Sequence, residues 1–252
     1  MNETCNLKAI ILKREPFREC DSKIIIYSLE KGKLALVARG AKKIGSKLSG
    51  HLEPFCYSEI MAIRGRQLEY AGSAVCAEAF PGIKKNLLKL AAAGRALKIF
   101  DRLLKENEPD EKIFFLLLDF LKMADRKNKI NPDFLFHLFV LKLFGELGHQ
   151  PELYFCVDCR EKIGREGNII DFEKGGLVCP GCQTKETGSG EAARRANYGR
   201  EGRPLALTEN CIKLLRLAGA KSLSELSFIK GSGRLEAEFI GRLRPLILLV
   251  NN

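Results

Sequence analysis

The sequence predicts an α+β protein in which a small N-terminal β-barrel precedes an α-helical domain with an inserted metal-binding segment. Three observations support this fold class. Short apolar runs separated by turn residues fill the first eighty residues. Longer stretches with apolar residues at three-and-four spacing follow Pro81. Two Cys-x-x-Cys pairs then interrupt the helical pattern, so the expected domains are residues 1–80 and 81–252, with the insertion at about 152–185.

The first domain has five runs with the composition of β-strands. These runs are residues 7–12, 23–29, 33–38, 55–63 and 67–76. Lys31-Gly32 and Arg64-Gly65 mark turns between them. Five strands of this length suit a five-stranded barrel of the OB type. A plain antiparallel sheet with no binding role would show the same runs, so both remain open at this point.

Three long stretches with helical periodicity open the second domain. These stretches are residues 87–104, 110–126 and 132–148, and each predicts one helix. The third has clear ends, because Pro132 suits the first turn of a helix and Gly148 suits the position beyond its last turn.

The C-terminal part of the chain also reads as helical. One helix is expected from Thr208 to just before Gly219, and Ser222 with Glu225 has the spacing of a capping box. The last apolar segment contains Pro245, which should kink or break it. Residues 183–204 are polar and rich in glycine, which predicts a mobile loop rather than a further domain.

The composition is that of a globular protein with excess positive charge. Hydrophobic residues make up 46% of the chain and charged residues 29%, which argues against wholesale disorder. The net charge of +11 favours an anionic partner such as nucleic acid. No uncharged apolar run reaches about 18 residues, so no membrane span is expected. The N-terminus lacks the pattern of a signal peptide, so we expect a cytoplasmic protein with four metal-binding and five free cysteines.

The two Cys-x-x-Cys pairs are the strongest motif in the chain. They comprise Cys156, Cys159, Cys179 and Cys182. Each pair can place two thiolates on one side of a tight turn, and two such turns complete a tetrahedral set around one zinc ion. Gly175, Gly176 and Gly181 permit the positive φ angles that such turns use. Four unrelated reduced cysteines, or a redox disulfide, are the alternatives.

Four thiolates leave no open coordination position, which favours a structural zinc over a catalytic one. The alternative is a zinc-dependent nucleic-acid hydrolase or deaminase. Deaminases combine His-x-Glu with Pro-Cys-x-x-Cys, and His51-Leu52-Glu53 matches the first part. However, neither Cys-x-x-Cys pair follows a proline, and the second pair would be left unexplained. We therefore expect no enzymatic activity.

A second informative stretch lies in the predicted barrel. No acidic residue occurs between Glu30 and Glu53, whereas this stretch contains Lys31, Lys33, Arg39, Lys42, Lys43 and Lys47. Arg64 and Arg66 could extend the positive track on the next turn. Lysine and arginine side chains in such a loop would neutralise backbone phosphates, so we predict DNA binding by these eight residues. A solvated charged turn is the alternative.

The same stretch resembles a nucleotide-binding loop but does not match it. In GAKKIGSK, Ser46 precedes Lys47, whereas a phosphate-binding loop requires lysine before the hydroxyl residue. The nearby Gly50 and Pro54 also disfavour the helix that must follow. An NTPase is therefore not expected.

Taken in succession, several short motifs resemble the RecO family of bacterial recombination mediators. They are the segment from Glu15 to Lys33, LVARGAKK, the LEPF tetrapeptide at 52–55, LGHQPEL at 147–153, FCVDC and GGLVCPGC. Their order covers nearly the whole chain, and this succession is more specific than any single motif.

The resemblance implies an N-terminal OB-fold, a helical domain and a zinc ribbon within that domain, with no enzymatic turnover. It implies binding of single- and double-stranded DNA and annealing of complementary strands. It further implies cooperation with RecR in loading RecA onto DNA coated by single-stranded DNA-binding protein (SSB), and contact with the C-terminal tail of SSB. Arg39, Lys42, Lys43 and Lys47 match the loop associated with DNA contact, and the four cysteines match the zinc ligands. A scaffold that binds an acidic peptide rather than DNA remains a further hypothesis.

Overall fold

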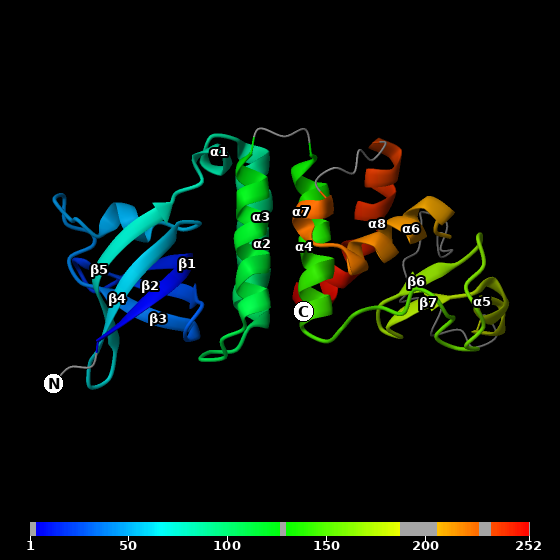
Figure 1. Ribbon diagram of the computed structural model, residues 1–252, viewed down its shortest axis with the longest axis horizontal. Coiled ribbons are helices and arrows are strands. Elements are labelled where there is room, and N and C mark those ends of the chain that lie inside the picture. The colour runs from blue at the N-terminus through cyan, green and yellow to red at the C-terminus, as the bar shows by residue number, and fades with distance from the viewer. Residues whose placement is uncertain (1–3, 127–129, 187–205, 227–232, 252) are drawn as a thin grey trace. The chain divides into compact units, whose positions relative to one another are not determined.

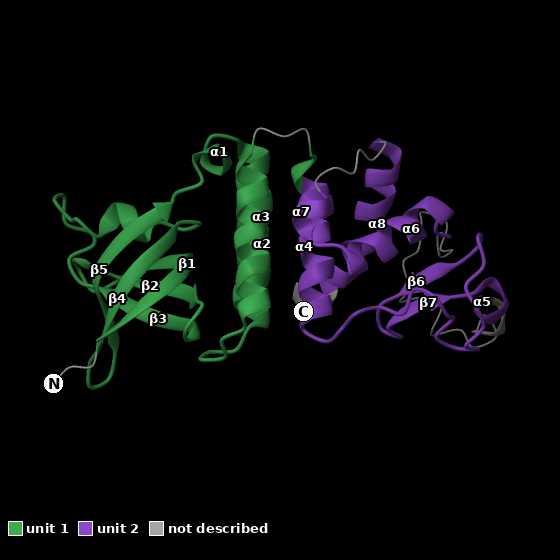
Figure 2. Cartoon of the chain, in the orientation of Figure 1, with its two compact units in different colours: residues 1–132 green, residues 133–252 purple. Residues whose placement is uncertain are grey.

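The computed structural model describes residues 4–126, 130–186, 206–226 and 233–251. The chain divides into two compact units, residues 1–132 and 133–252 (Figure 2). Of the predicted polar loop, residues 187–204 lie outside the described part of the chain. The prediction is wrong for residues 183–186, because they continue the helix Pro180–Glu186.

The N-terminal strands form a closed barrel, as predicted (Figure 1). The strands are β1 (Thr4–Phe17), β2 (Asp21–Ser28), β3 (Gly32–Ala38), β4 (Tyr57–Arg64) and β5 (Glu69–Glu78). They follow the order β1-β2-β3-β5-β4, in which β3 and β5 are parallel and the other recorded neighbours are antiparallel. A five-stranded barrel of this kind is an OB-fold, so the plain-sheet alternative is wrong.

Alternation of side chains along the strands fills the interior of the barrel. Successive residues of a strand point to opposite faces, so every second residue can face inward. The inward set comes from all five strands and includes Leu7, Ala9, Ile11, Ile24, Ile26, Leu34, Leu36, Ile60, Ala62, Ala71 and Ala74. A β-bulge between Ile11 and Lys13 shifts the alternation on β1. As a result, Arg14 pairs with Ile24 and shares its inward face.

The outer face of the barrel packs against helices of the same unit. These helices are α1 (Pro81–Lys84), α2 (Leu87–Leu103) and α3 (Glu111–Asp125). Tyr27 of β2 is fully buried, with its ring centroid 5.0 Å from that of Phe100, and its hydroxyl accepts the Asp110 N–H at 3.0 Å. Gly32 lies so close to the α2–α3 connection that a Cβ atom would sit 2.4 Å from the Glu108 carbonyl oxygen. This packing extends the compact unit to residue 132, and the domain boundary at residue 80 stays a prediction.

The second unit is a helical body that carries a small ribbon. Its helices are α4 (Pro132–Glu146), α5 (Pro180–Glu186), α6 (Glu209–Ala220), α7 (Leu223–Leu226) and α8 (Gly233–Asn251), and its hairpin strands are β6 (Ile169–Asp171) and β7 (Gly176–Val178). The rings of Phe134 and Phe239 pack 5.2 Å apart between α4 and α8. Lys142 of α4 donates to the Ala218 and Lys221 carbonyl oxygens at 3.0 and 2.6 Å, and so holds the end of α6.

The helix ends follow the sequence with two differences. Ser222 and Glu225 form the predicted capping box, because the Glu225 carboxylate accepts the Ser222 N–H at 2.8 Å and the Ser222 hydroxyl accepts the Glu225 N–H at 3.3 Å. The predicted end before Gly219 is wrong, since α6 continues to Ala220. A break at Pro245 is also absent, since α8 continues through it. Among the described helices, none has both the length and the apolar character needed to cross a membrane.

Candidate metal centre and nucleic-acid interface

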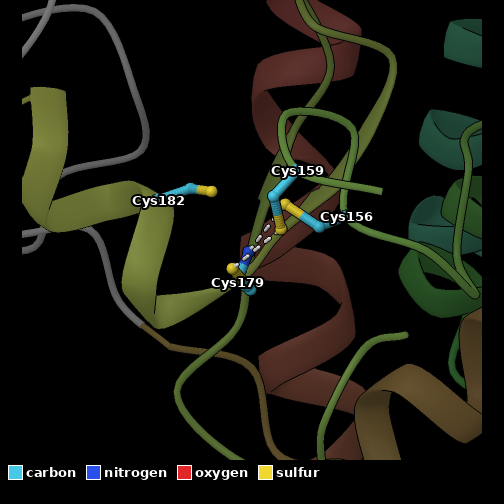
Figure 3. Close-up of side chains that lie close together, drawn as sticks. All are labelled: Cys156, Cys159, Cys179 and Cys182. Atoms are coloured by element: carbon cyan, nitrogen blue, oxygen red, sulfur yellow. Dashed lines mark hydrogen bonds between the residues drawn. The ribbon is translucent and has the colours of Figure 1, made fainter. Parts of the chain in front are cut away.

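Four cysteine sulfur atoms gather in the ribbon of the second unit, as the motif predicts. The Sγ atoms of Cys156, Cys159, Cys179 and Cys182 all lie within 4.8 Å of one another. In Figure 3, Cys182 projects from α5 toward the other three side chains. The Cys159 and Cys179 sulfur atoms are 3.7 Å apart. A tetrahedron with zinc–sulfur bonds of about 2.3 Å has edges of about 3.8 Å, so these donors fit one zinc-sized ion.

Backbone hydrogen bonds fold each Cys-x-x-Cys pair into a turn. The Cys156 N–H donates to the Glu161 carbonyl oxygen at 2.8 Å, and the Arg160 N–H donates back to the Cys156 carbonyl oxygen at 3.0 Å. In the second pair, the Cys182 N–H donates to the Cys179 carbonyl oxygen at 3.1 Å. The two pairs therefore reach the site from independent turns.

The glycine prediction for these turns holds only in part. Gly175 has a φ of +82°, but Gly176 and Gly181 do not adopt a positive φ. The positive φ of the first turn, +62°, belongs to Arg160 instead. Gly176 is needed for a different reason, because a Cβ atom there would lie 2.4 Å from the Glu152 carbonyl oxygen.

The surroundings of Cys156 favour ionisation of its thiol. Burial opposes ionisation of Cys156, but backbone N–H groups, including that of Cys179 at 3.4 Å, outweigh it and lower the pKa of the Cys156 thiol to about 6. The neighbouring Cys159 thiol, together with burial, raises the pKa of Cys182 to about 12. Metal binding requires thiolates, so a bound cation would replace the protons that these thiols share.

His51 and Glu53, the residues of the deaminase hypothesis, both have partners on strands of the barrel. The Cys76 N–H donates to His51 Nδ1 at 3.2 Å, and Glu53 Oε1 accepts from Arg14 Nη1 at 2.7 Å. Four sulfur atoms can complete a tetrahedral shell without either residue. The geometry therefore gives the hydrolase or deaminase hypothesis no support among the described residues.

The second candidate site is the loop between β3 and the short helix η1 (Ser49–Leu52), residues 39–48, which we call the basic loop. Arg14 of β1 forms hydrogen bonds both with the start of the basic loop and with the segment that follows the loop. Arg14 Nη2 donates to the Ala41 carbonyl oxygen at 3.0 Å. Its Nη1 donates to the Ser49 carbonyl oxygen at 3.3 Å and to Glu53 at 2.7 Å. One guanidinium thus joins the start of the loop to the segment that follows it.

The turn between β1 and β2 supports the start of the basic loop. Asp21 Oδ1 accepts the Gly40 N–H at 2.8 Å. The Lys42 N–H donates to the Cys20 carbonyl oxygen at 3.0 Å, and Lys42 Nζ donates to the Arg18 carbonyl oxygen at 2.8 Å. The loop is therefore anchored to two strands of the barrel rather than hanging free.

Six of the predicted DNA-binding residues are exposed. They are Arg39, Lys42, Lys43 and Lys47 on the basic loop and Arg64 and Arg66 at the β4–β5 turn. Within the described parts of the chain, no carboxylate lies at ion-pair distance from the four cations of the loop. Arg39 also lies over the Tyr70 ring, with its Cζ 4.1 Å from the ring centroid. Because Tyr70 is the second residue of β5 and pairs with Ile63 of β4, this contact brings Arg39 beside the β4–β5 turn.

The other two predicted residues have acidic partners. Lys31 Nζ lies 3.2 Å from the Glu69 carboxylate, and Lys33 Nζ lies 2.8 Å from the Asp101 carboxylate. Lys33 is mostly buried, with 16% of its side chain exposed, and also donates to carbonyl oxygens of Asp101 and Leu104. Because acidic side chains of the same chain balance the charges of Lys31 and Lys33, neither lysine is free to neutralise a DNA phosphate.

Sequence reasoning did not identify the residues that shape this surface. Arg14 follows a bulge that shifts the strand alternation, so its inward position has no periodic signature. Asp21 was not singled out, although an aspartate beside a tight turn often accepts backbone N–H groups. Tyr70 has no distinguishing pattern in the sequence, and the structure shows it half-buried beneath Arg39.

The fold and the two sites define a class of protein: an OB-fold barrel with an exposed basic loop, joined to a helical unit that carries a four-cysteine ribbon. The family model described as Recombination protein O N terminal matches residues 1–80, and that described as Recombination protein O C terminal matches residues 84–198. The chain therefore belongs to the RecO family.

Curated relatives agree with this assignment over nearly the whole chain. The protein named DNA repair protein RecO of Desulforamulus reducens is 31% identical over 241 residues, which cover 96% of this chain and 87% of the relative. Proteins with the same name in Symbiobacterium thermophilum and Dehalococcoides mccartyi are 28% and 27% identical, with 95% and 96% of this chain covered and 97% and 89% of the relatives.

Proposed function

We propose that this protein acts in recombinational DNA repair by binding single- and double-stranded DNA through the basic loop and annealing complementary strands. The observation that carries the proposal is the anchored loop on an OB-fold, which presents Arg39, Lys42, Lys43 and Lys47 without acidic partners among the described residues. A cation without an acidic partner can neutralise a backbone phosphate and release its counterion, which favours binding.

The four-cysteine ribbon has a structural role in this proposal. Cys156, Cys159, Cys179 and Cys182 would hold one zinc ion that fixes the ribbon on the helical unit. Arg216 of α6 supports the same attachment, because its Nε and Nη2 donate to the Leu153 carbonyl oxygen at 2.9 and 2.6 Å. The protein would therefore act by binding rather than by catalytic turnover.

The family resemblance supports a set of partners. We propose that the chain cooperates with RecR in loading RecA onto SSB-coated DNA and contacts the C-terminal tail of SSB. Such a role places the protein in the bacterial cytoplasm and at the nucleoid when active. The described residues assign no position to the RecR or SSB contacts.

The salt dependence of DNA binding tests the role of the basic loop. The variant Lys42→Gln/Lys43→Gln removes two cations from it. On a single-stranded oligonucleotide, the slope of log K against log salt should flatten by roughly 0.7 for each phosphate that the loop no longer neutralises, or about 1.4 for both. Fluorescence anisotropy over a salt series measures this slope.

A matched control separates the loop from net charge. The variant Lys98→Gln/Lys105→Gln removes two charges from exposed lysines on and just after α2, outside the basic loop. It should keep the wild-type slope. An unchanged slope in the loop variant, or an equal change in both variants, would contradict the proposed interface. Binding of an acidic peptide without binding of DNA would favour the scaffold hypothesis instead.

A further inference from the structure

The basic loop carries a large apolar side chain that the barrel leaves in solvent. Ile44 is fully exposed, at 102% of its reference surface, and lies between Lys43 and Lys47 in the sequence. A single exposed apolar residue is common and carries no meaning by itself. Here, however, the surrounding cations would draw a polyanion onto the same surface, so Ile44 would lie within reach of the bases.

The backbone around Ile44 is organised rather than extended freely into solvent. The Lys43 N–H donates to the Gly40 carbonyl oxygen at 3.1 Å, and the Ser46 N–H donates to the Lys43 carbonyl oxygen at 3.0 Å. A Cβ atom added at Gly45 would meet no atom within 4 Å, so the space beside Ile44 is open. Since Arg14 and Asp21 also fix the loop, Ile44 is presented without any rearrangement of the barrel.

A planar surface at the start of the same loop could also take a base. The Arg39 guanidinium lies over the Tyr70 ring, with Cζ 4.1 Å from the ring centroid. Arg39 is exposed overall, so a ligand could approach its guanidinium from the side away from Tyr70. Proteins that recognise single strands stack unpaired bases on aromatic rings and on guanidinium planes.

We infer that the basic loop contacts bases as well as phosphates and therefore binds unpaired DNA more tightly than duplex DNA. Ile44 packs against a base or wedges between two bases, as apolar side chains do in proteins that unstack DNA. A second base stacks on the Arg39–Tyr70 pair. In an intact duplex both base faces are covered by neighbouring pairs, so these contacts require unstacking, whereas a single strand offers them at lower cost. The inference rests on the proposed DNA-binding function and adds the form of DNA that the loop selects.

An abasic strand separates base contacts from phosphate contacts. The full chain is titrated into a labelled oligothymidine and into an oligonucleotide of the same length with abasic sites at every position, so that only the bases differ. Wild-type protein should bind oligothymidine roughly tenfold more tightly, which corresponds to about 1.4 kcal/mol. Ile44→Ser should lose roughly threefold to fivefold on oligothymidine, but little on the abasic strand, because it removes only an apolar contact with the bases.

Two further variants complete the test. Leu87→Ser replaces another exposed apolar side chain, 79% exposed at the start of α2 and outside the basic loop, and should leave both affinities unchanged. Tyr70→Leu keeps an apolar side chain beneath Arg39 but removes the ring. Like Ile44→Ser, it should lower the affinity for oligothymidine more than the affinity for the abasic strand. Thermal melting of each variant confirms that the barrel is intact.

The outcomes distinguish this inference from the proposed function. Equal affinity of the wild-type protein for both strands, or no effect of Ile44→Ser, would overturn the base contacts. In that case, salt-sensitive binding would leave the DNA-binding proposal standing. Failure to bind either strand at low salt would overturn both.

Discussion

Arg14 is a largely buried charge that supports an exposed surface. Its guanidinium joins Ala41, Ser49 and Glu53, which flank or begin the basic loop, while only 18% of its side chain is exposed. A fixed loop loses less conformational entropy when a strand binds, so the anchor should contribute to affinity without touching DNA.

Replacing Arg14 should weaken both the barrel and its DNA binding. Arg14→Gln leaves two carbonyl oxygens and the Glu53 carboxylate without their donor, which costs about 1–3 kcal/mol. We expect the free energy of unfolding in urea to fall by this amount and proteolysis within residues 39–48 to accelerate. Arg102→Gln makes the same charge change at an exposed position on α2, outside the basic loop, and serves as the control. Equal effects of the two variants would contradict an anchoring role.

Cys211 provides a pH-dependent test of the helical unit. Burial raises the pKa of this thiol to about 12. Above about pH 9 the unfolded chain releases the thiol proton while the folded chain retains it, so the unfolded state binds fewer protons. The free energy of unfolding should therefore fall as pH rises from about 9 toward 11, by at most about 1.4 kcal/mol per pH unit from this group. Urea unfolding of Cys211→Ala should show a smaller fall, and identical slopes would contradict the assignment.

The roles of some individual residues could be predicted from the sequence, and the roles of others could not. The four cysteines are predictable because ligand chemistry demands a fixed residue type at a fixed spacing. Lys33 looked like Lys42 in the sequence, yet it pairs with Asp101, more than sixty residues away in the chain. Whether a lysine is free or paired depends on such long-range contacts, which periodicity does not encode.

At the scale of elements, Gly32 controls how the β2–β3 turn meets the α2–α3 connection. Its φ is +68°, and a Cβ atom would lie 2.4 Å from the Glu108 carbonyl oxygen. Gly32→Ala should therefore destabilise the first unit by about 2–4 kcal/mol through backbone strain and overpacking. Gly45→Ala, which places a Cβ atom in open space, should change stability by less than about 1 kcal/mol. Thermal or urea unfolding measures both, and similar values for the two variants would show that this contact is unimportant.

The ribbon should depend on its metal, whereas the barrel should not. Cys179→Ser removes one of four sulfur donors, and binding free energy contributes to folding wherever a site is not preformed. Metal analysis should give one zinc per wild-type chain and substantially less for the variant. Hydrogen exchange should increase in residues 152–183 but stay unchanged in β1–β5. Cooperative loss of protection in both units would contradict their independence.

The elements themselves were largely predictable. All five strands and the long helices α2, α3 and α4 lie where apolar periodicity placed them, because each buries one face or the whole of its surface. The errors fell at features without periodicity. Gly219 is tolerated inside α6, Pro245 lies within α8, and the bulge in β1 depends on pairing with β2.

At the scale of the molecule, the fold decides where on the surface the positive charges lie. The net charge of +11 suggests an anionic partner, but it does not say where that partner binds. Closure of the barrel brings the start of β5 beside the end of β3, and this places Tyr70 beneath Arg39. The class of fold could be predicted from the sequence, whereas this juxtaposition required the strand order.

The most direct test of the account is the annealing of complementary strands that have first been coated with SSB, followed over a salt series without added nucleotide. We predict annealing by the wild-type protein that weakens steeply as salt increases, and loss of most of this activity in Lys42→Gln/Lys43→Gln, with Lys98→Gln/Lys105→Gln unaffected. DNA binding without annealing would contradict the mediator role and reduce the chain to a DNA-binding module. Annealing that is indifferent to the loop variant would contradict the central claim that the basic loop is the site of action.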